Sequence, residues 1–303
     1  MTIPIIFAID DRVVIACGVA LTSLSLNAHP DTHYDAYIMH QKDKLSAENQ
    51  EKLIQAFSGT ANISISFVQT PDYSAIDISG VHISHTTYCR LDIPELFPQF
   101  DKVIYADIDM IFQQDLSALF QDSLQKGEWV AAALDAGIDD NRSDYFNAGF
   151  LVMNLKAMRE NNVPELFRPH LSKKYEQNDQ DILNIVCKGH VELIPRSYNF
   201  QVNHFLHYMW GRTEPGISFK DLLRNSTLHY TWIKKPWNSL ECVAGDTWWH
   251  YYKLSPVYDD MFYFKRQQNQ IVTVQDDFHR KTNRQLIMRI LANIKHKILG
   301  KRV

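Results

Sequence analysis

The sequence contains no glycine-rich loop of the kind that binds nucleotide phosphates. Neither GxGxxG nor GxxxxGK[ST] occurs in its 303 residues, so we do not expect a backbone cradle for phosphates. Cysteine is also scarce: the chain has four, far apart and without a CxxC pair (Cys17, Cys89, Cys187 and Cys242). We therefore expect buried thiols in a reducing compartment, and neither disulfides nor a zinc site.

Long apolar runs are missing as well. No run of about 18 uncharged apolar residues occurs, so the sequence predicts no membrane-spanning helix. Residues 1–7 have neither the basic start nor the long apolar core of a signal peptide, which favours a cytoplasmic protein. Apolar residues make up 45% of the chain and charged residues 22%, as in proteins with a sizeable core.

Charge is unevenly distributed along the chain. The net charge of −4 argues against a general nucleic-acid binder. Residues 276–303 nevertheless carry +6, which leaves −10 on the rest. Apolar residues recur at helical spacing in this segment (Leu286, Ile287, Ile290, Leu291, Ile294 and Ile298). The pattern predicts a basic amphipathic helix on an anionic membrane surface; the alternative is a final helix that packs its apolar stripe on the rest of the chain.

Strands and helices alternate in the first 135 residues. The pattern predicts strands over residues 3–9, 34–40, 63–68, 102–107 and 129–134. It predicts helices over residues 15–26, 46–57, 86–97 and 116–124. Such alternation is typical of a mostly parallel sheet with helices on both faces and a ligand at the carboxyl ends of the strands.

Two aspartates stand one residue apart after the strand over residues 102–107. Asp107 and Asp109 would repel each other at the end of a buried strand unless a cation lay between them. A divalent cation with hard oxygen ligands meets that need and commonly carries a substrate's phosphates. The alternative is a strand that ends in a polar loop. Asp10-Asp11 and Asp135 also follow predicted strands, so we expect three acidic strand ends to face one crevice.

The second half of the chain has a different pattern. Residues 146–154 read as a small-residue turn entering an apolar strand, followed by a helix from residue 155 to about residue 170. Another helix is expected to open at residues 177–184, and a short strand-like run covers residues 227–232.

Six ordered segments give the chain its resemblance to a known family. They are residues 7–11, 82–91, 105–109, 146–149, 179–184, and His229-Tyr230 with Lys235-Pro236-Trp237. Together they resemble the family 8 retaining glycosyltransferases, especially the bacterial lipopolysaccharide galactosyl- and glucosyltransferases related to glycogenin. The resemblance implies an α/β GT-A fold: a Rossmann-like, mostly parallel sheet flanked by helices, with a small helical C-terminal appendage. Residues 1–250 would form the catalytic domain, and residues 251–303 a C-terminal region for membrane association.

The resemblance also implies a metal centre. Asp107, Asp109 and His229 would bind the cation, with diphosphate oxygens completing an octahedron. Manganese suits mixed carboxylate and imidazole ligands better than magnesium, which stays possible. On the residues alone, His229 between Leu228 and Tyr230 reads as a core histidine; the Lys-Pro-Trp that follows favours a ligand.

Residues for the nucleotide-sugar donor come from the same resemblance. Lys235 would contact the diphosphate as a point charge. Asp10 would accept from the uracil or the donor's polar edge, and Arg90 would neutralise the carboxylates around the donor sugar and span toward the metal site. The full donor set implied is Asp10, Asp11, His82, Arg90, Asp107, Ile108, Asp109, Asn147, Asp179, Gln180, His229, Trp232 and Lys235. Trp232 stands where relatives usually carry glycine, and Arg12 where they often carry asparagine.

The transferred hexose would lie among Asp135, Asn147, Asp179 and Gln180. Asp135, Asp179 and Gln180 are the implied catalytic residues. Because an amide oxygen is a poor nucleophile, we favour a front-face reaction in which the leaving diphosphate helps deprotonate the acceptor. The implied activity is transfer of galactose or glucose from a UDP-sugar to a lipopolysaccharide or lipooligosaccharide saccharide, at the inner face of the inner membrane.

Two other functions compete with this interpretation. Haloacid-dehalogenase-type phosphatases also place DxD after an apolar strand, although their motif usually lies near the N-terminus and continues to Thr or Val where this chain has Ile111. A metal-dependent carbohydrate-binding protein, or a transferase relative that has lost activity, is the non-enzymatic alternative.

Overall fold

The computed structural model describes residues 1–77, 85–136, 144–204, 219–231, 234–239 and 242–259. The chain divides into two compact units, Met1–Val257 and Tyr258–Val303. The first unit carries every element below. Residues 276–303, for which the sequence predicts an amphipathic helix, lie outside the described residues.

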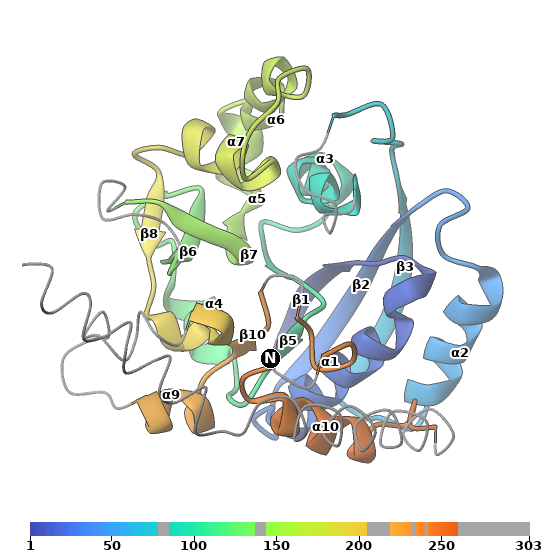
Figure 1. Ribbon diagram of the computed structural model, residues 1–303. Helices are drawn as coiled ribbons and strands as arrows, with labels where there is room; N and C mark the ends of the chain where they lie inside the picture. The colour runs from blue at the N-terminus through green and yellow to red at the C-terminus, as the bar shows by residue number, and fades with distance from the viewer. Residues whose placement is uncertain (78–84, 137–143, 205–218, 232–233, 240–241, 260–303) are drawn as a thin grey trace, which may run out of the picture. The chain divides into compact units, whose positions relative to one another are not determined.

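A seven-stranded sheet forms the centre of the first unit (Figure 1). Its strands are β1 (Thr2–Ala8), β2 (His33–Gln41), β3 (Ile63–Thr70), β4 (Lys102–Ala106), β6 (Val130–Leu134), β7 (Phe146–Asn154) and β8 (Val191–Leu193). They lie in the order β3-β2-β1-β4-β7-β6-β8. Only β7 runs against its neighbours β4 and β6, so β1, β4 and β6 share one direction and end at one edge. The predicted α/β architecture is confirmed.

Helices cover both faces of the sheet (Figure 1). They are α1 (Val14–Leu26), α2 (Ala47–Phe57), α3 (Ile93–Leu96), α4 (Ser117–Asp122), α5 (Leu155–Glu160), α6 (Val163–Phe167), α7 (Asp179–Val186), α9 (Phe219–Asn225) and α10 (Gly245–Leu254). Because strand side chains alternate, Ile5 packs in a core cluster with α1 and α2, whereas Ile6 packs in the other cluster with α3, α5 and α7. All four cysteines are buried free thiols, as expected.

A second sheet brings distant segments together. It pairs β5 (Met110–Ile111), β10 (Leu228–His229) and β9 (Phe200–Gln201). His229 lies opposite Met110 in the antiparallel β5–β10 ladder. The residue next to Asp109 is therefore hydrogen-bonded into the same sheet as His229, although the two are far apart in sequence.

Three predicted elements differ from the structure. The helix expected over residues 86–97 is a 3-10 helix, η2 (His85–Asp92), followed by the short α3. The long helix expected after residue 155 is broken into α5 and α6, because Asn162 adopts a left-handed conformation and Pro164 begins a new helix. The expected turn at residues 146–149 is the start of β7 itself.

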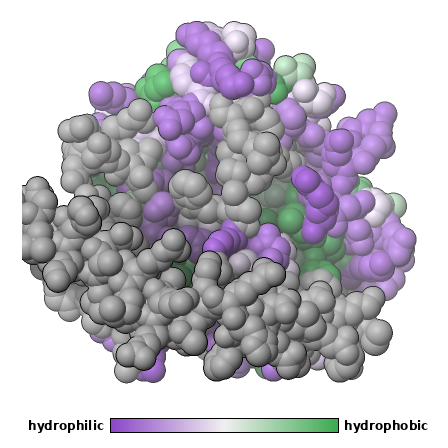
Figure 2. Space-filling model, viewed as in Figure 1, coloured by the Kyte–Doolittle hydropathy of each residue, from purple (hydrophilic) through white to green (hydrophobic). Residues whose placement is uncertain are grey.

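The first unit continues past α10. The Thr22 hydroxyl donates to the Ser255 hydroxyl at 2.9 Å, and Gly18 leaves the room in α1 that the Val257 side chain fills. Among the described residues, no helix is long and apolar enough to span a membrane. Hydrophilic residues predominate over α6 and α2 on the face in Figure 2, with smaller apolar groups between them.

Candidate active site

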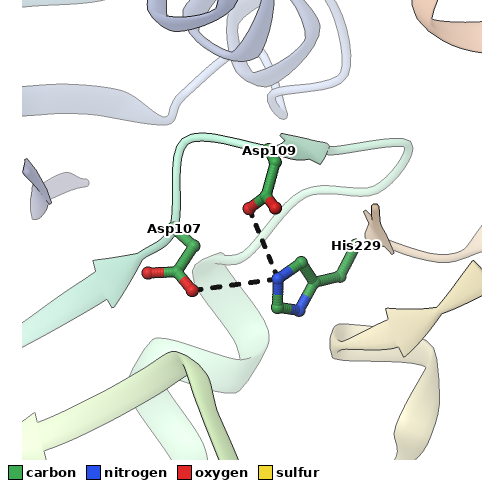
Figure 3. A group of neighbouring side chains, drawn as sticks. All are labelled: Asp107, Asp109 and His229. Carbon is green, nitrogen blue, oxygen red and sulfur yellow. Dashed lines mark ion pairs between the residues drawn. The ribbon is translucent and has the colours of Figure 1, made fainter. Parts of the chain in front are cut away.

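Asp107, Asp109 and His229 converge at the edge where β4 ends (Figure 3). The Nε2 atom of His229 lies 3.3 Å from Oδ1 of Asp109 and 3.8 Å from Oδ2 of Asp107. One ligand atom from each of the three lies within 4.8 Å of the others. Ligands about 2.1 Å from an octahedral cation lie about 3 Å apart when adjacent and about 4 Å when opposite, so this donor set fits a divalent cation.

Gly149 makes this convergence possible. A Cβ atom on Gly149 would lie 2.3 Å from Cε1 of His229 and 2.8 Å from Oδ2 of Asp107. The Gly149 carbonyl also accepts from the Asp107 backbone N–H at 2.7 Å, which fixes the end of β4 against β7. A residue with a side chain would force the ligands apart.

The second oxygen of Asp107 is held by Arg90 and Tyr105. Both the Arg90 Nη2 and the Tyr105 hydroxyl donate to Oδ1, at 2.9 and 2.8 Å. The Arg90 guanidinium is buried, lies over the Tyr105 ring, and also pairs with Asp179 at 2.9 Å. Burial opposes its charge, but Asp107 and then Asp179 outweigh burial and raise the pKa of Arg90. Arg90 thus links Asp107, expected at the metal, to Asp179, expected at the sugar.

Asp109 also uses both oxygens. Its Oδ2 accepts a hydrogen bond from the Lys235 ammonium, which also donates to the Tyr230 carbonyl at 2.6 Å. Burial alone would raise the pKa of Asp109, but Lys235 and His229 hold it well below its usual range. Lys235 therefore lies beside the candidate cation site, where a diphosphate would meet both charges.

Asp135, Asn147 and Gln180 form a second group. Asp135 Oδ2 accepts from Asn147 Nδ2 at 2.9 Å and from Gln180 Nε2 at 3.2 Å. The side-chain oxygen of Gln180, Oε1, accepts from the Ala148 backbone N–H at 3.0 Å. Asp179 begins the same helix as Gln180, and burial raises the pKa of its carboxyl although Arg90 opposes this. Three of the four residues expected around the hexose are therefore hydrogen-bonded to one another, and Asp179 adjoins Gln180 at the start of α7 and pairs with Arg90.

The acidic pair after β1 lies in a different environment. Asp10 pairs with Arg12, whose Nη2 lies 2.6 Å from Oδ2. Asp11 accepts from Ser46 and from Asn49 at the start of α2, and the Asn49 hydrogen bond is the main cause of its lowered pKa. Both aspartates line an open cavity of about 420 Å³ (with Arg12, Gln41, Asp43, Lys44, His85 and Thr86).

Three donor residues need separate mention. Ile108 is half-buried between the two metal aspartates and packs against the core. His82 and Trp232 lie outside the described residues, so their expected roles stay predictions.

Sequence reasoning missed Tyr105, Gly149 and Asn199. Tyr105 precedes Asp107 by two residues, and strand alternation could have placed both on one face. Gly149 lies in a segment that carries the family resemblance, but its role depends on contacts made in space. Asn199 accepts from Nδ1 of His229 at 2.8 Å, and nothing in the surrounding sequence signals this.

A family model now places this geometry in context. The model described as glycosyl transferase family 8 matches residues 4–241. The chain belongs to glycosyl transferase family 8. It is a glycosyltransferase by family, similar to lipopolysaccharide glucosyl- and galactosyltransferases, and the phosphatase alternative is set aside.

Family 8 members similar to this chain come from several bacteria. Glycosyltransferase GlyE of Streptococcus pneumoniae is 32% identical over 180 residues, which cover 56% of this chain and 42% of GlyE. A lipopolysaccharide 1,2-glucosyltransferase of Escherichia coli is 23% identical over 274 residues, 84% of this chain and 79% of that protein. The chain spans less than two thirds of the length of several curated relatives that it matches, down to 22% of Glycosyltransferase GlyD.

The fold also matches a solved galactosyltransferase. The structure of LgtC in complex with donor and acceptor sugar analogs superposes with a TM-score of 0.70 at 26% identity, covering 87% of this chain and 100% of LgtC. A further LgtC structure carries an active-site glutamine-to-glutamate mutation.

Proposed function

We propose that this family 8 glycosyltransferase is a metal-dependent, retaining hexosyltransferase. It would move galactose or glucose from a UDP-sugar to a saccharide of lipopolysaccharide or lipooligosaccharide. The observation that carries the proposal is the joining of two groups by Arg90: Asp107 of the metal set and Asp179 of the sugar set both pair with its buried guanidinium. The Arg90 guanidinium would thereby fix the spacing between the leaving diphosphate and the transferred sugar.

Asp107, Asp109 and His229 would hold the cation, which we propose to be manganese, with magnesium as the alternative. Two carboxylates and one imidazole make a mixed donor set that manganese accepts readily. When bound, the metal supplies positive charge for the leaving UDP. Lys235, already beside Asp109, adds a second charge at the same place, and stabilising the leaving group is the largest single contribution that this site can make.

The cavity lined by Asp10 and Asp11 is the proposed site of the uridine. It lies where β1 and β2 end, as expected for a nucleotide on this type of sheet. For Asp10 to accept from the uracil, either the Arg12–Asp10 ion pair must break or the uracil must bind to the intact pair. His82, Ile108 and Trp232 are kept as proposed donor contacts.

Gln180 is proposed to orient and stabilise rather than to attack. Its carbonyl oxygen accepts from the Ala148 N–H and its Nε2 donates to Asp135, so the amide is held at both ends. An amide oxygen is also a weak nucleophile. These facts favour front-face transfer with retention, in which the diphosphate takes the acceptor proton while Asp179 and Gln180 stabilise the cationic sugar. LgtC, which is similar in fold, also has a glutamine in its active site.

UDP-sugar hydrolysis with manganese and without acceptor tests the enzyme directly. We expect slow hydrolysis of UDP-galactose or UDP-glucose, lost in Asp109→Asn by at least a hundredfold. Asp101→Asn is the matched control, because it changes an exposed aspartate at the opposite end of β4. Hydrolysis of a phosphomonoester instead would indicate a phosphatase, and donor binding without turnover an inactive relative. With an acceptor present, a β-linked first product by proton NMR would contradict retention.

We also propose that the C-terminal region, predicted from sequence over residues 251–303, associates with the inner face of the inner membrane. Because Ser255 and Val257 pack against α1, the part that suffices for catalysis would extend from residue 1 to Val257 rather than end at residue 250. Basic residues beside an apolar stripe bind anionic bilayers at about 1 kcal/mol per residue. Deleting residues 276–303 should abolish binding to anionic vesicles at low salt and leave UDP-sugar hydrolysis intact. Unchanged vesicle binding by the truncated protein would contradict the proposal.

A further inference from the structure

The Nδ1 atom of His229 faces a fully buried asparagine. Asn199 is 0% exposed, and its Oδ1 lies 2.8 Å from Nδ1. A neutral imidazole carries its proton on one nitrogen and a lone pair on the other, and only the lone pair can bind a metal. Whatever meets Nδ1 therefore decides whether Nε2 can be a ligand.

The orientation of Asn199 is set by Asn147. The Gly149 backbone N–H, which can only donate, lies 3.0 Å from Oδ1 of Asn147. The Asp135 carboxylate accepts from Nδ2 of the same side chain at 2.9 Å. Both partners place the Asn147 carbonyl oxygen on the Gly149 side, so its amide cannot be reversed without losing both hydrogen bonds.

Asn199 follows from this arrangement. Its Nδ2 donates to Oδ1 of Asn147 at 2.9 Å, which leaves its own Oδ1 for His229. An amide oxygen only accepts, so Nδ1 of His229 must carry the proton. The lone pair is then on Nε2, the atom that faces Asp107 and Asp109.

Without Asn199, the neighbouring carboxylates would favour the opposite arrangement. A proton on Nε2 would be attracted by both Asp107 and Asp109, and it would occupy the direction needed for the metal. The buried Oδ1 of Asn199 opposes that tautomer, because an unprotonated Nδ1 of His229 would then point its lone pair at a lone pair of that oxygen.

We propose that Asn199 is a positioning residue that holds His229 in its metal-binding tautomer, with Asn147 as the group that orients Asn199. The inference rests on the proposed metal centre. The same hydrogen-bonded chain continues through Asp135 to Gln180. The proposed metal ligand and the expected sugar-binding residues are therefore oriented by one relay, which is buried at Asn199 and Asn147 and half-buried at Asp135 and Gln180.

Manganese binding to the full-length protein, measured by electron paramagnetic resonance of the free ion, tests this role without using activity. Asn199→Leu removes the acceptor and should raise the dissociation constant for manganese about ten- to hundredfold. Asn199→Asp keeps an acceptor at Nδ1 and should bind within about threefold of the wild type. Asn199→Ala, too short to reach Nδ1, replaces the leucine variant if that does not fold.

Asn27→Leu is the matched control. Asn27 is half-buried just after α1, where its side chain donates to the Ser23 and Phe112 carbonyls at 2.9 Å. The variant should bind manganese as the wild type does. Unchanged binding in folded Asn199→Leu, equal loss in Asn199→Asp, or equal loss in Asn27→Leu would each overturn this inference alone. Absence of binding by the wild type would overturn the metal centre and this inference with it.

Discussion

Two pairs of aspartates follow two neighbouring parallel strands, β1 and β4, yet they have different partners. Asp10 and Asp11 bond to residues 2 to 38 positions away: Arg12, Ser46 and Asn49. Asp107 also has near partners, Tyr105 and Arg90, but His229 faces both Asp107 and Asp109, and Lys235 donates to Asp109 from 126 residues away. The first pair closes a local turn and starts a helix, whereas the second assembles a charged centre.

The difference shows what a carboxylate at a strand end can and cannot indicate. The strand places the side chain at the carboxyl edge of the sheet in both cases. Whether it becomes a metal ligand depends on what the rest of the fold places against it. Here that is β10, which carries His229 into contact with both aspartates.

Removing the charge of Arg90 should have the largest effect on the second pair. Arg90→Met would leave Asp107 and Asp179 facing each other across a buried, uncharged side chain. We expect the free energy of unfolding to fall by about 3–5 kcal/mol, measured by urea denaturation. Arg159→Met, which removes a half-buried arginine bonded mainly to backbone carbonyls, is the control and should cost clearly less. An equal loss of unfolding free energy in both variants would mean that Arg90 contributes no more than a half-buried arginine without buried carboxylate partners.

Filling the space at Gly149 should separate the ligands without changing any of them. A Cβ only 2.3 Å from the His229 ring must displace it or Asp107. We expect Gly149→Ala to weaken manganese binding by about a hundredfold, or about 2.7 kcal/mol, in titrations of the folded protein. Gly59→Ala is the control, since nothing lies within 4 Å of its added Cβ. Normal metal affinity in Gly149→Ala would show that the two aspartates do not need His229 at this distance.

Much of the difference between the two aspartate pairs could not be predicted from the sequence. Alternating apolar runs predicted the strands of the parallel half of the sheet and placed Asp107 and Asp109 at its edge. Of the second sheet, the sequence predicted only β10, within the strand-like run over residues 227–232. The other two strands, β5 and β9, have two residues each and too little sequence for a periodic signal. On its own residues His229 read as a core histidine, and it is in fact buried. Only the family resemblance identified it as a ligand.

The supports of the site were harder still to predict. Arg90 was expected to link the sugar and metal groups, but its 3-10 helix was predicted as α-helix. Gly149 and Asn199 act on atoms 30 or more residues away, so the local sequence pattern carries no information on them.

A half-buried carboxyl on which burial outweighs the charge of Arg168 should behave oppositely to Asp109. Burial, followed by repulsion from Glu95, raises the pKa of Asp92 to about 6, and the Tyr73 hydroxyl donates to it. The unfolded value is about 3.9, so the stabilising contribution of the protonated form is complete below pH 4 and is lost as pH rises through 6. Allowing for its partial hydration, Asp92→Asn should stabilise the fold by about 1 kcal/mol at pH 7 and hardly at pH 4. Melting curves at the two pH values test this; a gain at pH 4 alone would contradict it.

The smallest effect is expected at Asp11, where it bears directly on the two pairs. Asp11→Ala removes hydrogen bonds to Ser46 and Asn49 at the start of α2 and should lower the melting temperature by only about 2 °C. Manganese affinity should not change, because Asp11 contributes nothing to the group of Asp107, Asp109 and His229. Asp11→Asn, which keeps an acceptor oxygen, should recover most of the loss. If Asp11→Ala instead weakened manganese binding as Asp109→Asn does, the acidic ends of β1 and β4 would form one centre, and the division between local and long-range partners would be wrong.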